Sequence, residues 1–312
     1  MIAITGASGF VGSALARHLE TGGQHVRRLI RSESRRAQDT DVVVGNIGAD
    51  TAWDHALAGV DCVVHCAARV HVMSETEVDP LEAFRQVNGL GSMRLAEAAA
   101  ALGVRRLIFL SSIKVLGEDT PPNQPFDAQS EARPQDAYGR SKLEAEQALT
   151  SIAQRTGLEL VIIRPPLVYG PGVGANFQAL IKAVQRGWPL PLANVHNHRS
   201  LVGLGNLLDL IATCIHHPAA AGRPLLVSDG DDLSTPELIR HMATALGTNA
   251  HLLPFPVTAL HLAGRLTGRS AQVRRLTDSL QVDITETTRQ LGWIPSRTVG
   301  EELADTVRSL TP

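Results

Sequence analysis

The sequence predicts an α/β fold with a doubly wound parallel sheet, because short apolar runs rich in β-branched residues alternate with longer amphipathic segments. The strand candidates are residues 2–5, 26–30, 42–44, 62–66, 107–111 and 160–164. Residues 11–20, 80–102 and 138–156 have helical periodicity, and each can cross over between two parallel strands. We therefore expect helices on both faces of the sheet.

A glycine-rich turn directly follows the first strand candidate. Gly6, Gly9 and Gly12 let the backbone turn tightly and approach a pyrophosphate at the N-terminus of the first helix. The same spacing also occurs in strand-to-helix turns without a ligand, but its place at the start of the alternating pattern favours a dinucleotide. The first part of the chain is therefore predicted to be a Rossmann domain.

The residues after the second strand bear on the choice of cofactor. About 20 residues beyond the glycine motif, an acidic residue is typical of NAD sites, and an arginine accommodates the 2′-phosphate of NADP. This chain has Arg31 there, with Arg35 and Arg36 close behind. NADP(H) is favoured and NAD(H) is possible, because Glu33 could reach a ribose and the arginines could form a solvated basic face.

After residue 164 the pattern changes. Residues 165–172 contain several prolines and glycines and are predicted to be a rigid turn. They are followed by helix candidates at 175–187, 204–217, 235–246, 257–266 and 299–310, with one strand-like run at 224–228. We expect residues 1–170 to form the dinucleotide-binding domain. Residues 171–312 are expected to be mainly a smaller, interleaved substrate lobe, with some segments returning to the first domain.

Composition excludes several classes of protein. The 312 residues can bury a core without metals or disulfides, and the net charge of −2 gives no general attraction to nucleic acid. Cys62, His65 and Cys66 lie in one apolar strand whose alternate residues face opposite sides, so no metal site is expected. The sparse cysteines, the lack of an N-terminal leader and the lack of any membrane-spanning run predict a cytoplasmic protein.

A candidate catalytic set lies at the predicted ligand edge. Tyr138 and Lys142 are four residues apart and share one face of a helix, where the ammonium is expected to lower the pKa of the phenol. Such a pair also occurs on helix surfaces without function. Ser112 follows the fifth strand, where it could either cap a turn or orient a substrate oxygen. Together the three predict proton exchange during hydride transfer with a nicotinamide.

At these residues the chain resembles the extended short-chain dehydrogenase/reductase family, which includes nucleotide-sugar epimerases, dehydratases and ketoreductases. The motifs are the glycines at 6, 9 and 12, His65-x-Ala67-Ala68, Asn88, Ser111-Ser112 with Val115 and Gly117, Tyr138-x-x-x-Lys142, and Arg164-Pro165-x-x-Val168-Tyr169-Gly170-Pro171. The resemblance covers nearly the whole chain. It implies that Ser112 and Tyr138 are catalytic, and that Lys142 also holds the nicotinamide ribose.

The resemblance also implies binding residues for cofactor and substrate. The residues expected at the cofactor are Gly6, Ser8, Gly9, Phe10, Val11, Gly12, Arg31, Asn46, Ile47, Ala67, Ala68, Lys142, Pro165 and Val168. Those expected at a UDP-sugar are Ser112, Asn176, Arg199 and Arg275, with Arg199 on the diphosphate because a planar guanidinium suits phosphate oxygens. For Arg275 a surface ion pair is an equal alternative. His71 and Met73 could line the sugar pocket.

Three departures from the family pattern narrow the expected reaction. Asn46 stands where the family usually has Asp, and Leu116 stands where it often has Tyr. Ile113 and Lys114 replace the Asp-Glu pair of the 4,6-dehydratases, so dehydration is not expected.

The runs around residues 67–72, 111–115 and 198–202 look most like bacterial reductases of UDP-4-keto-6-deoxy-N-acetylhexosamines in surface polysaccharide synthesis. A UDP-hexose or UDP-N-acetylhexosamine 4-epimerase is the alternative, since the same site would serve it. A dinucleotide-sensing protein without activity is a third reading. The resemblance leaves a homodimer open.

Overall fold

The computed structural model describes residues 1–35, 38, 40–70, 79–121 and 123–310. At its centre is a 7-stranded parallel sheet, which confirms the predicted fold class. Across the sheet the strands are β3 (Val42–Val43), β2 (Val26–Ile30), β1 (Ile2–Thr5), β4 (Cys62–His65), β5 (Arg106–Leu110), β6 (Glu159–Arg164) and β9 (Pro224–Leu226). The strand order reverses between β1 and β4. In such sheets ligands bind at that point, beyond the carboxyl ends of the strands.

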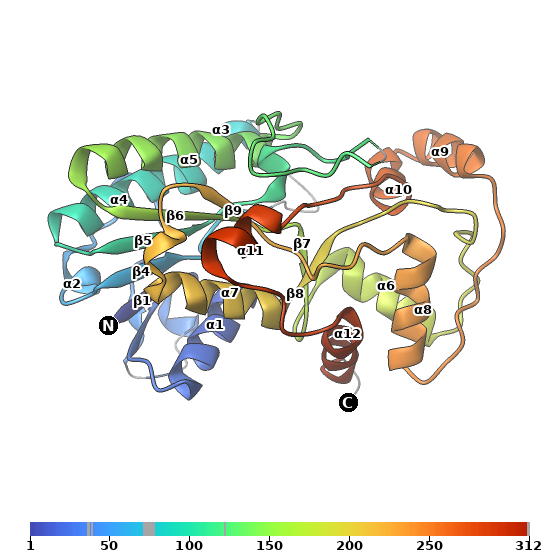
Figure 1. Cartoon of the computed structure of the whole chain (residues 1–312), viewed down its shortest axis with the longest axis horizontal. Helices are drawn as coiled ribbons and strands as arrows, with labels where there is room; N and C mark the ends of the chain where they lie inside the picture. Colours follow the sequence, from blue (N-terminus) through green and yellow to red (C-terminus); the bar gives the residue numbers. More distant parts are fainter. Residues whose placement is uncertain (36–37, 39, 71–78, 122, 311–312) are drawn as a thin grey trace.

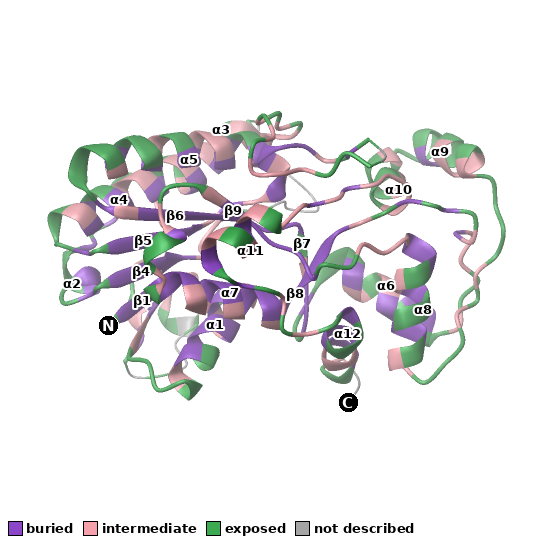
Figure 2. Cartoon of the chain, viewed as in Figure 1, coloured by how far each residue is buried: buried purple, intermediate pink, exposed green. Residues whose placement is uncertain are grey.

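Helices cover both faces of this sheet (Figure 1). On one face lie α1 (Phe10–Thr21) and α7 (Leu204–His216), whose apolar side chains pack with β1 and β4 in one core cluster. On the other face α4 (Ser92–Ala101) and α5 (Ala137–Thr156) pack with the opposite side chains of β4, β5 and β6. The central strands β1 and β4 are consequently buried along their length, as Figure 2 shows in purple. The helices packed on both faces therefore fix the position of the carboxyl edge of the sheet.

The remaining elements are short or belong to the C-terminal part. They are η1 (Glu33–Arg35), α2 (Asp54–Leu57), α3 (Pro80–Phe84), η2 (Arg85–Gly91), η3 (Ile113–Val115), β7 (Leu167–Tyr169), α6 (Ala175–Gln185), β8 (Leu201–Gly203), η4 (Pro218–Ala220), α8 (Thr235–Ala245), α9 (Val257–Leu266), α10 (Ser270–Thr277), α11 (Thr285–Leu291) and α12 (Val299–Arg308). Apolar residues of α6, α8 and α12 form a separate core. By contrast, β9 extends the main sheet beside β6.

The helical stretch predicted over residues 80–102 is present, but its interpretation as one regular helix was wrong. The structure has α3, then a π-helical segment at Arg85–Gly91, then α4. The wider π turn brings Asn88 inward, where it is 1% exposed and its side chain bonds to both backbone groups of Arg69. Gly91 follows at a close approach, since a Cβ there would lie 2.6 Å from the Ile47 side chain. Helical periodicity does not distinguish this insertion from a regular helix.

The prediction that residues 165–172 form only a turn was also wrong. Leu167–Tyr169 is the strand β7, which pairs in parallel with β8 in a separate 2-stranded sheet. A strand this short, bracketed by Pro166 and Gly170, carries too few residues to show alternation. Its partner β8 lies far along the chain, so no local sequence pattern predicts the pairing. The helices α2, α10 and α11 were likewise not predicted, and the bounds of several strands differ by one or two residues.

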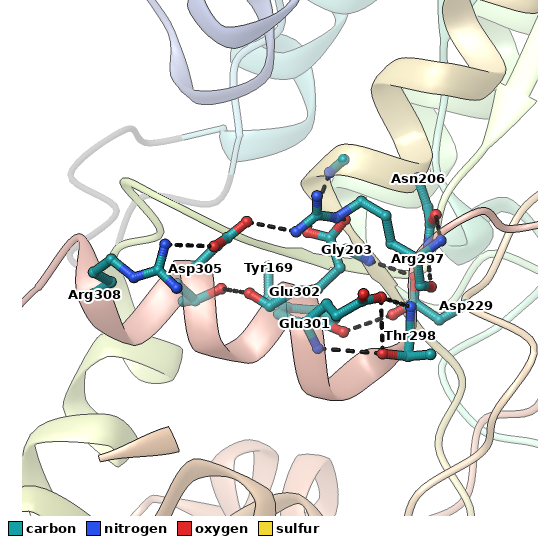
Figure 3. Close-up of polar contacts among 12 residues, drawn as sticks. Tyr169, Gly203, Asn206, Asp229, Arg297, Thr298, Glu301, Glu302, Asp305 and Arg308 are labelled. Atoms are coloured by element: carbon teal, nitrogen blue, oxygen red, sulfur yellow. Dashed lines mark hydrogen bonds and ion pairs between the residues drawn. The ribbon is translucent and has the colours of Figure 1, made fainter. Parts of the chain in front are cut away.

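A buried polar network fixes β7 and β8 to the C-terminal helix (Figure 3). The hydroxyl of Tyr169 donates to Asp229 at 2.7 Å, and Asp229 also accepts from the backbone of Gly203 and from Asn206 at 2.8 Å. Asn206 exchanges two hydrogen bonds with the backbone of Arg297, at 2.9 and 3.0 Å. The side chains of Tyr169, Asp229 and Asn206 thus all have partners, and these bonds anchor β7 and β8 to the C-terminal part of the chain.

Candidate active site

The glycine loop between β1 and α1 fits close contact with a dinucleotide. Gly6 has a φ of +66°, and a Cβ there would lie 2.8 Å from the backbone nitrogen of Ala67. A Cβ on Gly12 would overlap the carbonyl oxygen of Gly6. Only glycine suits both positions, so the loop stays thin and the first backbone N–H groups of α1 are left facing outward. Ser8 and Gly9 are exposed at this surface, while Phe10 and Val11 are half-buried.

Four neighbouring strands deliver predicted site residues to one edge. Gly6 follows β1, Ala67 follows β4, Ser112 follows β5 and Pro165 follows β6, and these strands are adjacent in the sheet. The backbone of Ile113 donates to the carbonyl oxygen of Pro165 at 2.9 Å, which ties the last two loops together. Ala68 continues the loop after Ala67, and Val168 is half-buried in β7. These positions support a nicotinamide lying across the strand ends.

Ser112 and Tyr138 meet beyond the carboxyl end of β5. Ser112 lies close enough to Tyr138 to lower the pKa of its hydroxyl, and the ring of Tyr138 packs edge-on against Phe84 at 6.0 Å between centroids. Ser112 also caps η3 by accepting from the backbone of Lys114 at 3.3 Å, which confirms the capping role considered for it. Two neighbouring hydroxyls at this edge could share the oxygen of one substrate hydroxyl or ketone.

The expected lowering of the tyrosine pKa is not seen. Burial, together with the charge of Asp136, raises the pKa of Tyr138 to about 12, although the bond with Ser112 lowers it. The reason is that the Lys142 ammonium is directed elsewhere: it donates to the carbonyl oxygen of Leu110 at 2.8 Å and lies 4.4 Å from the ring centroid of Phe109. Without a ligand, Tyr138 is therefore a neutral proton donor.

Lys142 is itself strongly perturbed. It is 1% exposed, and burial lowers its pKa to about 8, while Glu146 and Cys66 act in the opposite direction. Glu146 is held by Ser111 at 2.5 Å and by Arg164, so its charge is already shared. A buried lysine with one backbone bond keeps two ammonium hydrogens for a ribose or a substrate.

The approach of α5 to η3 depends on residues that the sequence analysis did not single out. A Cβ on Gly139 would lie 2.6 Å from the carbonyl oxygen of Lys114, so the first turn of α5 packs directly on that backbone. Asp136 caps the helix by accepting from Gly139 at 2.7 Å and pairs with Lys114 at 2.5 Å. Burial opposes ionisation of Asp136, but these contacts outweigh it and lower its pKa. Aspartate three residues before a glycine at a helix start was the available signal.

The residues expected near the adenosine lie on the other side of the switch point. Arg31 directly follows β2 and is exposed, and Asn46 is exposed just beyond β3. Ile47 is half-buried, and its side chain lies close to the backbone of Gly91. Since β2 and β3 are neighbours, Arg31 and Asn46 lie at adjacent strand ends. This placement suits an adenosine but does not distinguish NAD from NADP.

On the substrate side the structure brings Arg199 and Arg275 together. Burial lowers the pKa of Arg199, the Asp278 carboxylate raises it, and the positive charge of Arg275 lowers it again. Arg275 lines a pocket of about 280 Å³ with Glu118, Ser270, Ala271, Arg274 and Asp278. A larger hollow of about 710 Å³ lies between α5 and the β6–β9 edge and contains none of the predicted site residues. The lining of the smaller pocket thus combines two arginines with two carboxylates.

The other predicted substrate residues are less informative. Asn176 is exposed near the start of α6. His71 and Met73 lie outside the described residues. Arg274, the neighbour of Arg275, pairs with Asp119 at 3.2 Å and with Asp278 at 3.1 Å.

His65 has a structural environment. Its two ring nitrogens contact the hydroxyls of Thr5 at 2.6 Å and Ser92 at 2.9 Å. Burial and then the charge of Lys142 lower its pKa to about 3, so the ring is neutral near pH 7. Within the described ranges no group of histidine, cysteine and acidic side chains could hold a metal ion.

Comparison with known proteins identifies the family of this chain. A family model described as the NAD dependent epimerase/dehydratase family matches residues 2–227. The chain belongs to that family. This confirms the resemblance drawn from the sequence motifs and makes the protein an enzyme of the epimerase/dehydratase family.

Individual relatives cover nearly the whole chain. A protein of Vibrio cholerae called UDP-glucose 4-epimerase is 45% identical over 99% of this chain and 94% of its own length. An Escherichia coli O157:H7 protein called N-acetyl-alpha-D-glucosaminyl-diphospho-ditrans,octacis-undecaprenol 4-epimerase is 27% identical over 98% of this chain and 94% of its own length. Among solved structures, UDP-glucuronic acid 4-epimerase from Bacillus cereus in complex with NAD aligns with a TM-score of 0.79 at 18% identity, over 99% of this chain and 98% of its own. The latter likeness supports the fold.

No helix in the part of the chain that the structure describes is both long enough and apolar enough to span a bilayer.

Proposed function

We propose that this epimerase/dehydratase-family enzyme is a 4-epimerase of a UDP-linked hexose or N-acetylhexosamine. The observation that carries the proposal is the convergence of Ser112, the glycine loop and the buried Lys142 at the carboxyl edge of the sheet, with Ser112 near Tyr138. The 45% identical relative, named as a UDP-glucose 4-epimerase, supports C4 as the reacting carbon. A division into residues 1–170 for the dinucleotide and mainly 171–312 for the sugar nucleotide is part of the same proposal.

The chain's own residues would divide the work as follows. Ser112 orients the C4 oxygen, and Tyr138 takes the proton from that oxygen or returns it. Lys142 uses its free ammonium hydrogens to hold the ribose of the cofactor and to favour loss of the tyrosine proton. The loop of Gly6, Gly9 and Gly12 lets the pyrophosphate of the cofactor approach the backbone N–H groups, which donate to it. Arg199 and Arg275 offer two guanidinium groups to the diphosphate of the substrate. The nicotinamide, when bound, supplies hydride exchange at C4.

A 4-reductase of a UDP-4-keto-6-deoxy-N-acetylhexosamine is the second candidate. Arg31 at the end of β2 favours it, because an arginine there accommodates the 2′-phosphate of NADP, the usual donor for net reduction. Proton and hydride transfer at C4 are the same elementary step in both reactions. The catalytic residues therefore cannot separate them, but the fate of the cofactor can.

Dehydration is not part of the proposal. Ile113 is 3% exposed and Lys114 is paired with Glu118 and Asp136, each at 2.5 Å. These two positions replace the acid pair of the dehydratases and offer no free carboxylate.

The deciding experiment follows cofactor and product together. Purified protein is incubated with UDP-glucose, UDP-N-acetylglucosamine and a UDP-4-keto-6-deoxy-N-acetylhexosamine, with and without NADPH. An epimerase equilibrates a hexose with its C4 epimer without added reductant, and cofactor copurifies with it. A reductase consumes one NADPH for each keto-sugar. Stoichiometric NADPH consumption without any epimerisation would replace our first choice by the second, and neither outcome would remove the proposed C4 chemistry.

A further inference from the structure

The segment from residue 251 to residue 277 has a surface that the fold does not explain. Four of the large apolar side chains exposed in the described chain lie in it: Leu253 at 50%, Phe255 at 40%, Leu262 at 59% and Leu266 at 79%. Single exposed apolar residues are normal on soluble proteins, but a group of this kind on one segment marks a contact surface.

Helix geometry shows that these leucines face away from the protein. The buried residue of α9 is Gly264, where a Cβ would lie 2.8 Å from the side chain of Val273 in α10. Each residue of an α-helix turns about 100°. Leu262 and Leu266, two residues before and after Gly264, are therefore on the opposite side of α9, and on nearly the same line as each other. Packing against α10 cannot account for them.

A tryptophan lies on the chain segment beside this one. Leu190 and Leu253 share a backbone hydrogen bond of 2.8 Å, and Trp188 stands two residues before Leu190 with 54% of its surface exposed. The guanidinium of Arg186 lies 5.3 Å from the centroid of its indole ring. Indole and guanidinium groups are favoured at the boundary between lipid and water.

The segment that contains α9 and α10 carries no acidic side chain of its own. Residues 238–277 contain no Asp or Glu, nor do residues 160–208, although the whole chain has 31 acidic residues and a net charge of −2. The exposed arginines of α9 and of its connection to α10 are Arg265 and Arg269, whereas Arg274 in α10 pairs with Asp119 and Asp278. Helices with outward leucines and arginines but no acids are typical of proteins that lie on anionic bilayers.

We infer that the outward side of α9, with Phe255, Leu253 and Trp188 beside it, docks on the surface of an anionic lipid bilayer. Figure 1 places α9 and α10 at the end of the molecule away from the seven-stranded sheet, where a planar surface can approach. The apolar side chains enter the headgroup boundary, and Arg265 and Arg269 pair with lipid phosphates. This association is peripheral and does not depend on which sugar the enzyme converts.

The test uses the full-length protein and sedimentation with vesicles. Wild type should bind vesicles of phosphatidylglycerol and phosphatidylcholine at low salt, and should bind pure phosphatidylcholine much less. Leu262→Ser with Leu266→Ser should reduce binding roughly tenfold or more, because two leucines no longer leave water. Arg265→Gln with Arg269→Gln should also weaken it, and added salt should weaken wild type.

A matched double variant separates this surface from apolar exposure in general. Leu102→Ser with Ile294→Ser removes side chains that are 40% and 65% exposed on other elements, and it should bind as wild type does. All variants should keep their turnover on soluble substrate, since none of these residues lines the site. The arginine variant keeps the test decisive if the leucine variant unfolds.

Three outcomes would overturn the inference. Wild type could fail to bind anionic vesicles, or the α9 and control variants could bind equally well. Light scattering could instead show that Leu262→Ser with Leu266→Ser dissolves an oligomer, which would assign the surface to a second copy of this chain. None of these results bears on the C4 chemistry, which is measured separately.

Discussion

At the scale of single residues, the two tyrosines of the chain have opposite roles. Tyr138 contacts Ser112 at the sheet edge, while Tyr169 is fully buried and donates to Asp229. Both have a raised pKa because both are buried. Position at the ligand edge, rather than perturbation alone, separates the candidate acid from the structural hydroxyl.

We expect Tyr138→Phe to lower turnover by about 10²- to 10⁴-fold, the usual contribution of a positioned acid or base. Cofactor affinity should stay close to wild type, because the ring and its contact with Phe84 remain. Steady-state rates and titration with the dinucleotide check both statements. Tyr169→Phe is the control: it should lower thermal stability and leave turnover within a few-fold. A Tyr138→Phe enzyme that kept most of its activity would remove this residue from the chemistry.

Arg31 carries the prediction about cofactor preference. Arg31→Asp removes a guanidinium that could bind a 2′-phosphate and places a repelling charge there, so NADPH affinity should fall by roughly tenfold or more. NADH affinity should change little or rise. Arg17→Asp, which makes the same charge change at an exposed position of α1, should affect both cofactors equally and slightly. Parallel binding titrations with NADPH and NADH measure the ratio of the two affinities in each protein. If Arg31→Asp and wild type had the same ratio, that result would argue for NAD.

At the scale of elements, the sequence predicted what depends on local pattern. The strands that end at Thr5 and His65 are mainly apolar runs, and the structure contains them. The π turn around Asn88 and the pairing of β7 with β8 were not predictable. The first requires a tertiary contact that draws Asn88 inward, and the second joins two short segments far apart in the chain.

The seating of α5 yields a prediction about one glycine. Gly139→Ala should destabilise the protein by about 1–3 kcal/mol, the usual cost of overpacking, and should lower turnover, because the new methyl group meets the Lys114 carbonyl oxygen. Shifting the first turn of α5 displaces Tyr138 from Ser112. Urea unfolding and steady-state rates measure the two effects.

Gly89→Ala is the matched control for this change. Gly89 is also helical, but a Cβ there would meet nothing within 4 Å. The variant should therefore be at least as stable as wild type and fully active. Equal behaviour of the two variants would show that α5 tolerates the methyl group without moving.

At the scale of the whole molecule, convergence of strand ends explains how distant motifs form one site. Gly6, Ala67, Ser112 and Pro165 come from neighbouring strands, so the predicted topology already implied that they meet. The electrostatics did not follow from topology. The sequence put Lys142 beside Tyr138, whereas the ammonium bonds to the carbonyl oxygen of Leu110, because a buried charge takes the nearest strong acceptor.

The buried His65 makes the stability of the fold depend on pH. Burial, then Lys142, lowers its pKa to about 3 from the ordinary 6.5, so below pH 6.5 the unfolded chain takes up a proton that the folded protein refuses. The contribution of neutral His65 to the free energy of unfolding is therefore fully present above pH 6.5. As the pH drops toward 3, the free energy of unfolding falls by up to about 1.4 kcal/mol per pH unit. His65→Asn removes this titration along with the contacts to Thr5 and Ser92, so the variant is less stable at pH 7.

The difference between wild type and His65→Asn should therefore shrink as the pH is lowered from 7 to 4. Carboxylates titrate in both proteins and cancel in that difference. Urea unfolding at several pH values measures it, with His55→Asn, which replaces an exposed histidine, expected to follow wild type throughout. If the difference stayed constant with pH, the imidazole would titrate alike in the folded and unfolded chains. That result would contradict the buried position of His65 between Thr5 and Ser92.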